Sequence, residues 1–273
     1  MPRVSLAITS YNRRDYLGAA IDSVRAQTMP DWELVVWDDG STDDSVAVAR
    51  AHAHDDPRIR VVAAEHSGAA ESLRQALAQT TAPYLGWLDS DDLLAPAALE
   101  KTMNVLDSEP AVGVVYSDYI VIDEDGRPLG LGHRCQIPYS PQRMLVDFPM
   151  FHFRLIRRQV FDQVGGIDTS FHNAYDYDLC LRLSEVTAVT HLRQPLYYYR
   201  RHAATMSIGR RMEQIDEARR AVEAALRRRR LDAQYELQVQ LVSRFILKPR
   251  AASLSRELPE TSFLTKNGYN MFT

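Results

Sequence analysis

Residues 4–43 read VSLAITSYNRRDYLGAAIDSVRAQTMPDWELVVWDDGSTD. This stretch begins with an apolar run of β-favouring residues, continues with Leu17, Ile21 and Val24 at helical spacing, and returns to a second apolar run. Two such runs separated by a helical pattern are typical of a βαβ unit, in which both strands lie parallel in one sheet. The stretch therefore predicts an α/β fold.

The same alternation continues over the first 110 residues. It predicts strands at residues 4–8, 34–37, 59–62 and 84–88, with helices crossing residues 17–24, 46–49 and 73–77. This order predicts a mostly parallel, Rossmann-like sheet flanked by helices, with right-handed crossovers. Further along, the Asp-Glu-Asp-Gly string at residues 123–126 separates two apolar runs and predicts a hairpin turn.

Polar strings follow three of the predicted strands: TSYN at 9–12, DDGS at 38–41 and DSDD at 89–92. A doubly wound sheet binds ligands at the carboxyl ends of its strands, so these strings mark a candidate site. No GxGxxG or GxxxxGK[ST] loop that would cradle phosphates occurs at the first turn. An Asp-x-Asp string instead offers hard oxygen ligands to Mg²⁺ or Mn²⁺, which would hold a diphosphate. The alternative is that each acidic string is only a turn followed by a helix N-cap.

Composition places the chain among globular proteins. Its 273 residues are 45% hydrophobic and 25% charged, which predicts one large domain with an appendage. No apolar run approaches the roughly 18–20 residues of a membrane span, and no cleavable signal is visible at the start. Cys135 and Cys180 are far apart and belong to no CxxC motif, as expected of reduced thiols. We therefore expect a cytoplasmic protein without a structural zinc site.

The charge is divided along the chain. From residue 209 onward there are 13 Lys and Arg against 8 Asp and Glu, whereas residues 1–208 hold 19 against 28. The acidic main body argues against a nucleic-acid groove, because phosphate binding needs a basic face. Metal binding is one explanation for its carboxylates.

Six strings occur in order along the first 202 residues. They are VSLAITSYNR at 4–13, VWDDGSTD at 36–43, LDSDD at 88–92, RRQVFDQVGGID at 157–168, DYDLCLRL at 176–183 and YYRRH at 198–202. Their order and spacing closely resemble those of the family 2 glycosyltransferases of the GT-A fold, over roughly residues 3–207. The resemblance implies a transferase that moves a hexose from a nucleoside diphosphate sugar to an acceptor hydroxyl.

The resemblance assigns the donor side of the site. It implies that Asp38 accepts a hydrogen bond from the imide N–H of uracil, and that Thr9 and Tyr11 flank the base. A carboxylate suits uracil or thymine, since both rings carry that N–H and cytosine lacks it. The donor is therefore of the UDP or dTDP type.

The resemblance also assigns the metal. It implies that Asp91 is the principal ligand of Mn²⁺ or Mg²⁺, and that Asp89 and Asp92 contact the ribose or a metal-bound water. In similar enzymes a residue of the late YYRRH segment reaches the metal or the diphosphate, and here this residue would be His202. The alternative is a surface histidine after a strand. His52, His54 and His66 read as surface positions.

By resemblance the catalytic base is Asp176, although Tyr175 stands where the family has a Glu. Alternatively, Asp176 and Asp178 are first-turn acids that complement a helix dipole, with Leu179 and Leu183 on the buried face. Asp176 and Asp178 would point some 200° apart on a helix, so only one of them is expected to face the acceptor.

Residues 210–250 predict two amphipathic helices. The first carries a stripe of Met212, Ile215, Val222, Ala225 and Leu226 followed by the basic run at 227–230, and the second carries Leu237, Leu241, Phe245 and Ile246. The expected explanation is packing against the main domain or homodimerisation, with the arginines facing water. A peripheral contact with an anionic membrane is the alternative, and it would suit a lipid-linked acceptor. The tail from Ala251 is expected to wrap or fray.

We therefore predict a GT-A domain at residues 1–208, with a nucleotide-binding half at about 1–118 and an acceptor half at about 119–208. A basic helical extension occupies 209–273. The predicted reaction is an inverting, metal-dependent transfer of a single sugar in polysaccharide or glycolipid synthesis of the cell envelope. The chain lacks the QxxRW motif of processive synthases. The rival interpretations are a catalytically degenerate module that binds a nucleotide sugar or a protein, and a receiver-like domain, whose acidic pair would follow the first strand.

Overall fold

The computed structural model describes residues 1–202 and 211–240. Within these residues, nine strands form one sheet in the order β3-β2-β1-β4-β8-β6-β9-β5, and β7 pairs with β6 outside this path. The strands are β1 (Val4–Ser10), β2 (Trp32–Asp38), β3 (Ile59–Ala63), β4 (Tyr84–Asp89), β5 (Leu93–Leu94), β6 (Val112–Ile122), β7 (Pro128–Leu131), β8 (Arg154–Arg157) and β9 (Ala188–Arg200). The helices are α1 (Arg14–Arg25), α2 (Ser45–Ala53), α3 (Ala69–Ala78), α4 (Ala98–Ser108), α5 (Arg158–Gln163), α6 (Tyr175–Val186) and α8 (Arg211–Arg228), with short 3₁₀ turns η1 (His133–Gln136) and η2 (Arg143–Leu145).

The N-terminal half of the sheet is parallel, as predicted. β1 pairs in parallel with β2 and β4, and β2 pairs in parallel with β3. Beyond β4 the sheet is mixed: β8 is antiparallel to both β4 and β6, whereas β9 is parallel to β6. The predicted hairpin is also present, since β6 and β7 pair antiparallel across the 123–126 turn.

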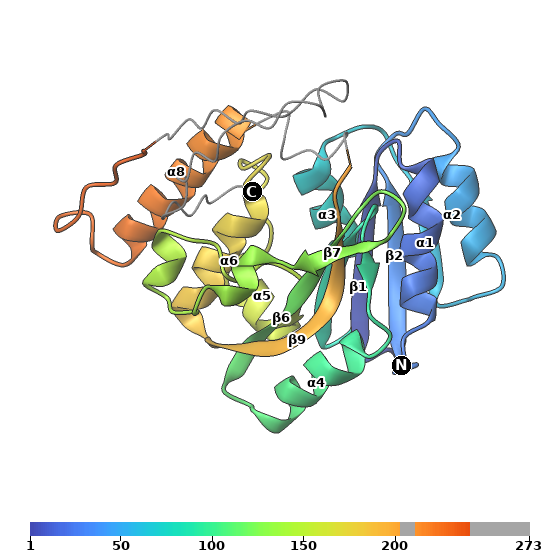
Figure 1. The fold of residues 1–273 in the computed structure, drawn as a ribbon, viewed down its shortest axis with the longest axis horizontal. Coiled ribbons are helices and arrows are strands. Elements are labelled where there is room, and N and C mark those ends of the chain that lie inside the picture. Colours follow the sequence, from blue (N-terminus) through green and yellow to red (C-terminus); the bar gives the residue numbers. More distant parts are fainter. Residues whose placement is uncertain (203–210, 241–273) are drawn as a thin grey trace, which may run out of the picture.

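Helices cover both faces of the sheet (Figure 1). On one face Leu6 of β1 belongs to a core shared with Leu17 of α1, and on the other face Ala7 belongs to a core shared with Leu73 of α3. Successive side chains of a strand point to opposite faces, so β1 must be apolar on both. This explains why the strands of the parallel half read as continuous apolar runs.

Helix α8 packs against α6, on the side of the molecule away from α1 and α2 (Figure 1). Five of its residues enter the same core as α6, namely Ala218, Ala221, Val222, Ala225 and Leu226. Met212, at the start of the predicted stripe, is instead 63% exposed. The predicted helix is therefore present, and its buried face lies in its C-terminal half.

The arginine run after this stripe does not simply face water, as the sequence led us to expect. Both Arg228 and Arg229 donate hydrogen bonds to the Glu185 carboxylate of α6. Glu185 offers two oxygens next to the helix end, so the two guanidiniums are drawn onto the protein surface. Membrane contact and dimerisation stay predictions.

The predicted second helix and the tail follow α8 in the sequence. Leu237 lies in a segment without regular structure. Leu241, Phe245 and Ile246 of the predicted second helix, and the tail from Ala251, lie outside the described residues. In the part of the chain that the structure describes, no helix is long and apolar enough to cross a membrane.

Candidate active site

The register of the parallel strands brings their polar ends together. Ser10 of β1 lies opposite Asp38 of β2, and Thr9 lies opposite Asp89 of β4. A cavity of about 430 Å³ opens at this edge, lined by Thr9, Tyr11, Asp39, Asp89, Asp91 and Asp176 among others. The carboxyl edge of the parallel sheet is therefore the candidate site, as this fold class predicts.

The DDGS turn is held from within by its first acid. Asp38 is 1% exposed, and its two carboxylate oxygens accept hydrogen bonds from the amide (2.8 Å) and the hydroxyl (2.6 Å) of Ser41. Gly40 has a φ of +76°, and a Cβ there would lie 2.8 Å from the His66 amide nitrogen, so the turn requires glycine. Ser41 Oγ also accepts the Asn12 amide at 2.8 Å. Asp38 thus shapes the turn and is not among the cavity-lining residues.

The second acid of the turn, Asp39, does line the cavity. Its Oδ1 accepts the Ser67 amide at 2.7 Å and its Oδ2 accepts the Gly68 amide at 3.0 Å. His66 Nδ1 lies 2.9 Å from Asp39 Oδ2, and the His66 ring centroid is 4.4 Å from that of Tyr11. Two aromatic rings therefore stand beside a buried carboxylate, an arrangement suited to a planar ring that carries N–H donors.

The structure divides the DSDD string into lining and buried acids. Asp89 and Asp91 line the cavity, whereas Asp92 is 1% exposed. The Oδ1 of Asp92 accepts the Arg200 amide at 2.6 Å, and its Oδ2 accepts the Tyr197 hydroxyl at 2.7 Å. Both donors belong to β9, so Asp92 fastens that strand beside the end of β4. Asp92 is not among the cavity-lining residues, and the ligand role that the resemblance implied for it stays a prediction.

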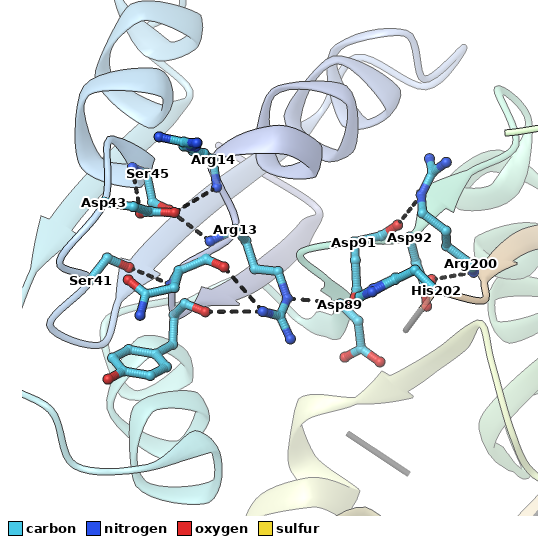
Figure 2. Close-up of polar contacts among 12 residues, drawn as sticks. Arg13, Arg14, Ser41, Asp43, Ser45, Asp89, Asp91, Asp92, Arg200 and His202 are labelled. Atoms are coloured by element: carbon cyan, nitrogen blue, oxygen red, sulfur yellow. Dashed lines mark hydrogen bonds and ion pairs between the residues drawn. The ribbon is translucent and has the colours of Figure 1, made fainter. Parts of the chain in front are cut away.

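Two cationic or basic side chains meet at Asp91 (Figure 2). His202 Nε2 lies 2.9 Å from Asp91 Oδ2, and Arg13 Nε lies 3.5 Å from the same oxygen. The ring of Tyr16 stacks on the His202 ring with centroids 4.9 Å apart, which fixes the imidazole plane. The late segment therefore reaches the acidic string, and binding of the metal or the diphosphate by His202 stays a prediction.

Negative charge is concentrated around Asp89. Desolvation in the cavity, with the carboxylates of Asp91 and Asp176, raises the pKa of Asp89 to about 7. His152 Nε2 lies 3.6 Å from Asp89 Oδ2. Burial and the nearby Arg154 hold the pKa of His152 well below its usual value, so this imidazole is neutral and does not offset the charge. A bound cation would offset this negative charge.

Helix α6 presents Asp176 to the cavity from its first turn. Asp176 Oδ2 lies 3.3 Å from the guanidinium of Arg154, which is 2% exposed and comes from β8. This ion pair between α6 and β8 fixes the position of the Asp176 side chain at the cavity. Asp176 is therefore an acid that α6 places in the cavity, and its role as the base stays a prediction.

Asp178 has different surroundings on the same helix. It is 2% exposed, and its Oδ2 accepts a hydrogen bond from Arg182 Nε at 2.8 Å. Arg182 also donates to the carbonyl oxygens of Val164 and Gly166. Burial raises the pKa of Asp178 above its usual value. The ion pair of Asp178 and Arg182 thus joins α6 to the 164–166 turn, away from the cavity.

The structure brings most of the predicted site residues to one place. Thr9, Tyr11, Asp89, Asp91 and Asp176 line the cavity, and His202 contacts Asp91. Asp38 and Asp92 lie buried beside it. The residues that the sequence analysis missed are Asp39, Arg13, His152 and Arg154. His66 is exposed, as predicted, and it also lines the cavity. Asp39 and Arg13 stood inside the quoted strings and could have been found, whereas His152 and Arg154 belong to no recognisable string.

Residues 5–165 match the family described as Glycosyl transferase family 2, which is more than half of the sequence. The chain belongs to glycosyltransferase family 2. A curated relative, the chondroitin synthase of Escherichia coli, is 31% identical over 208 residues, covering 76% of this chain and 30% of the synthase. This family 2 member thus spans less than a third of the length of that relative.

Two solved structures share the fold of this family 2 member. S. aureus TarS 1-349 in complex with UDP-GlcNAc has a TM-score of 0.67 at 18% identity, covering 83% of this chain and 66% of the TarS 1-349 chain. The mannosyltransferase PcManGT of Pyrobaculum calidifontis, in complex with GDP-Man and Mn²⁺, has a TM-score of 0.61 at 19% identity, covering 86% and 76%. The predicted GT-A fold is therefore confirmed.

Proposed function

We propose that this chain transfers one hexose from a nucleoside diphosphate sugar of the UDP or dTDP type to an acceptor hydroxyl, with inversion at the anomeric carbon. One observation carries the proposal: the carboxylate of Asp176 lines the same cavity as Asp89 and Asp91. The acids at the end of β4 serve the leaving diphosphate, and the acid on α6 serves the acceptor. A single base candidate on the acceptor side is sufficient for one displacement.

The base subsite is assigned to Tyr11, His66 and Asp39. Asp38 was the residue that the resemblance implied, but Asp39 is the acid that lines the cavity beside the two rings. Its carboxylate suits an imide N–H, which favours uracil and thymine over cytosine. Thr9, at the end of β1, lies next to this subsite in the lining.

A divalent cation fits the residues present. Asp91 offers a carboxylate oxygen and His202 an imidazole nitrogen 2.9 Å away, a donor pair compatible with Mn²⁺ or Mg²⁺. No group of three or more metal-binding side chains occurs among the described residues. This is consistent with a cation held by one or two protein ligands together with substrate phosphates and water. When bound, the cation would offset the charge that develops on the diphosphate.

The chemistry of the protein groups follows from their positions. The acceptor hydroxyl oxygen bonds to the anomeric carbon as the bond from that carbon to the diphosphate oxygen breaks, and the hydroxyl proton passes to Asp176. Arg154 holds Asp176 through its Oδ2. Arg13, 3.5 Å from Asp91, adds a cation that can contact the diphosphate.

The acceptor and the cellular location are also part of this proposal. The relative named chondroitin synthase supports a growing glycan, free or lipid-linked, as the acceptor. Cys135 and Cys180 are buried free thiols, which supports a cytoplasmic location. Peripheral membrane contact through residues beyond 208 remains part of this proposal.

The decisive test is turnover of nucleotide sugars. The purified chain should release UDP from UDP-GlcNAc or another UDP-sugar in the presence of Mn²⁺, and EDTA should abolish the release. UDP should also bind more weakly in calorimetry when EDTA is present. A chain that binds UDP equally well with and without EDTA, or that turns over none of a panel of UDP, dTDP, GDP and CDP sugars, would contradict the proposal.

A further inference from the structure

Helix α8 reaches the active-site cavity although it lies beyond the residues that match the family. Gln214, in the first turn of α8, is one of the lining residues. Its Oε1 is enclosed and has no hydrogen-bond partner among the residues that the structure describes. Buried polar atoms in folded proteins are almost always paired with protein, water or ligand, so this amide oxygen is available to accept a hydrogen bond from a molecule in the cavity.

The position of Gln214 is fixed by its neighbour one turn along, Glu217. Glu217 is 9% exposed, and its Oε2 accepts the amides of Asn173 (2.6 Å) and Ala174 (3.1 Å). These two residues lead directly into α6, which begins at Tyr175 and has no side-chain cap of its own. A carboxylate at a helix start also complements the helix dipole. Helix α8 is thus fastened to the segment that precedes Asp176.

A second contact ties α8 to the same segment. The guanidinium carbon of Arg220 lies 5.0 Å from the ring centroid of Phe171. Gln214, Glu217 and Arg220 are spaced three residues apart, so they share one face of the helix. This face of α8 therefore covers residues 171–174 and ends at the cavity.

The ligand class follows from the lining around Gln214. The cavity includes His172, Asn173, Tyr175 and Tyr199 together with the base candidate Asp176. Any hydroxyl that Asp176 deprotonates must lie within hydrogen-bond reach of it. A saccharide hydroxyl both donates and accepts, as a carboxamide does, and the aromatic rings offer flat apolar faces to a pyranose ring.

We propose that α8 is the acceptor-side wall of the active site and that Gln214 binds a hydroxyl group of a saccharide acceptor. The proposal rests on the transferase function above and deepens it by naming a helix and a residue that bind the acceptor. Gln214 acts on acceptor binding and leaves nucleotide binding unchanged, because the base subsite is built from β1, β2 and the 66–68 loop.

The test compares Gln214→Ala with Gln234→Ala, an exposed glutamine outside α8. The probe is an array of mono- to tetrasaccharides, with each protein loaded with UDP and Mn²⁺. The wild type and Gln234→Ala should bind the same glycans, and Gln214→Ala should bind them about 3–10-fold more weakly, as expected for one lost hydrogen bond. UDP affinity, measured by calorimetry, should be equal in all three.

Several results would overturn the proposal: a wild type that binds no glycan, a Gln214→Ala variant that binds glycans as the wild type does, or one whose UDP affinity falls while glycan binding stays constant. Turnover of the panel of UDP, dTDP, GDP and CDP sugars, measured in the same preparations, distinguishes failure of the acceptor wall from failure of the transferase function. If the protein turns over a donor and its glycan binding does not depend on Gln214, only the proposed role of α8 and Gln214 is contradicted. Glycan binding that depends on Gln214 without turnover supports the wall and contradicts the transferase function.

Discussion

Asp176 and Asp178 stand two residues apart on α6, yet only Asp176 faces the cavity. Asp176→Asn should therefore reduce turnover of the donor by roughly 10²–10⁴-fold, because the variant cannot take up the acceptor proton. Its UDP affinity, measured by calorimetry, should stay close to that of the wild type. Asp178→Asn is the matched control, and it should instead lower the melting temperature, because Arg182 loses a buried carboxylate partner. An Asp176→Asn protein that keeps most of its turnover would exclude this residue as the base.

The two acids of the DDGS turn allow an equally sharp comparison. Asp39→Asn should weaken UDP and dTDP alike by roughly 10–100-fold, since a hydrogen bond to a charged group contributes about 1.5–3 kcal/mol. Asp38→Asn should mainly lower stability, because Asp38 holds Ser41 and lies outside the lining. CDP should bind the wild type poorly. A larger loss of UDP affinity in Asp38→Asn than in Asp39→Asn would show that Asp38, as the resemblance implied, and not Asp39 binds the base.

The sequence located this site better than it resolved the roles within it. Strand ends are visible in sequence, so the three polar strings could be placed at one edge. Loop geometry decides which acid of the DDGS turn lines the cavity. The 66–68 loop, whose amides donate hydrogen bonds to Asp39, carries no recognisable sequence motif. Arg154 could not be predicted for a similar reason, because its proximity to Asp176 comes from the pairing of β8 with β4 and β6.

At the scale of elements, the start of α6 depends on a residue from another helix. Glu217→Ala should destabilise the protein by about 1–2 kcal/mol, the range for loss of a helix cap, and should lower donor turnover by loosening the segment before Asp176. Thermal melts and turnover rates measure both effects. Glu213→Ala, an exposed acid one turn earlier on α8, is the control and should change neither. Equal melting temperatures for the two variants would show that the contacts of Glu217 with Asn173 and Ala174 do not support α6.

The connection between α2 and β3 predicts a pH dependence of stability. Arg58 donates hydrogen bonds to both carboxylate oxygens of Asp56 and stacks 3.7 Å from the ring centroid of Trp32. The hydrogen bond from Arg58 lowers the pKa of Asp56 in the folded protein. The stabilisation is therefore fully present above the unfolded-state pKa of about 4 and is lost as pH falls through the lower folded-state pKa.

Asp56→Asn should accordingly destabilise the protein at pH 7, and the difference from the wild type should shrink as the pH is lowered below 4. Urea unfolding at a series of pH values measures this difference. Asp55→Asn, whose side chain is 86% exposed, should show little effect at any pH. A destabilisation by Asp56→Asn that stayed constant down to pH 2 would contradict the role of the ionised pair.

Local periodicity predicted the elements of the parallel half, because each strand there is apolar on both faces and each helix has one apolar stripe. The mixed half was not predicted in detail. β6 pairs with β9, and more than 60 residues separate the two strands in the sequence. The sequence of neither strand indicates which strand it pairs with. Pairing over such separations is decided by how the two cores close around the sheet, which the local pattern does not contain.

At the scale of the whole molecule, we expect that the charge division along the chain does not mark an independent unit. The acidic body and the basic helix are joined, since α8 contributes to the core beneath α6 and its arginines pair with Glu185. The boundary predicted near residue 209 therefore separates two compositions, and we expect both sides of it to unfold together.

Leu226→Ala tests this cooperativity. Leu226 is 7% exposed, and its truncation should cost about 2–4 kcal/mol through lost burial and the cavity that remains. The three tryptophans, Trp32, Trp37 and Trp87, all lie in the parallel half, so their fluorescence reports unfolding of the main body alone. If α8 is part of one cooperative unit, the tryptophan transition of Leu226→Ala should move down by roughly 5–10 °C. Met212→Ala, on the same helix but exposed, should leave it in place. An unchanged tryptophan transition in Leu226→Ala, with loss of helical signal at lower temperature, would mean that α8 is an appendage that melts separately.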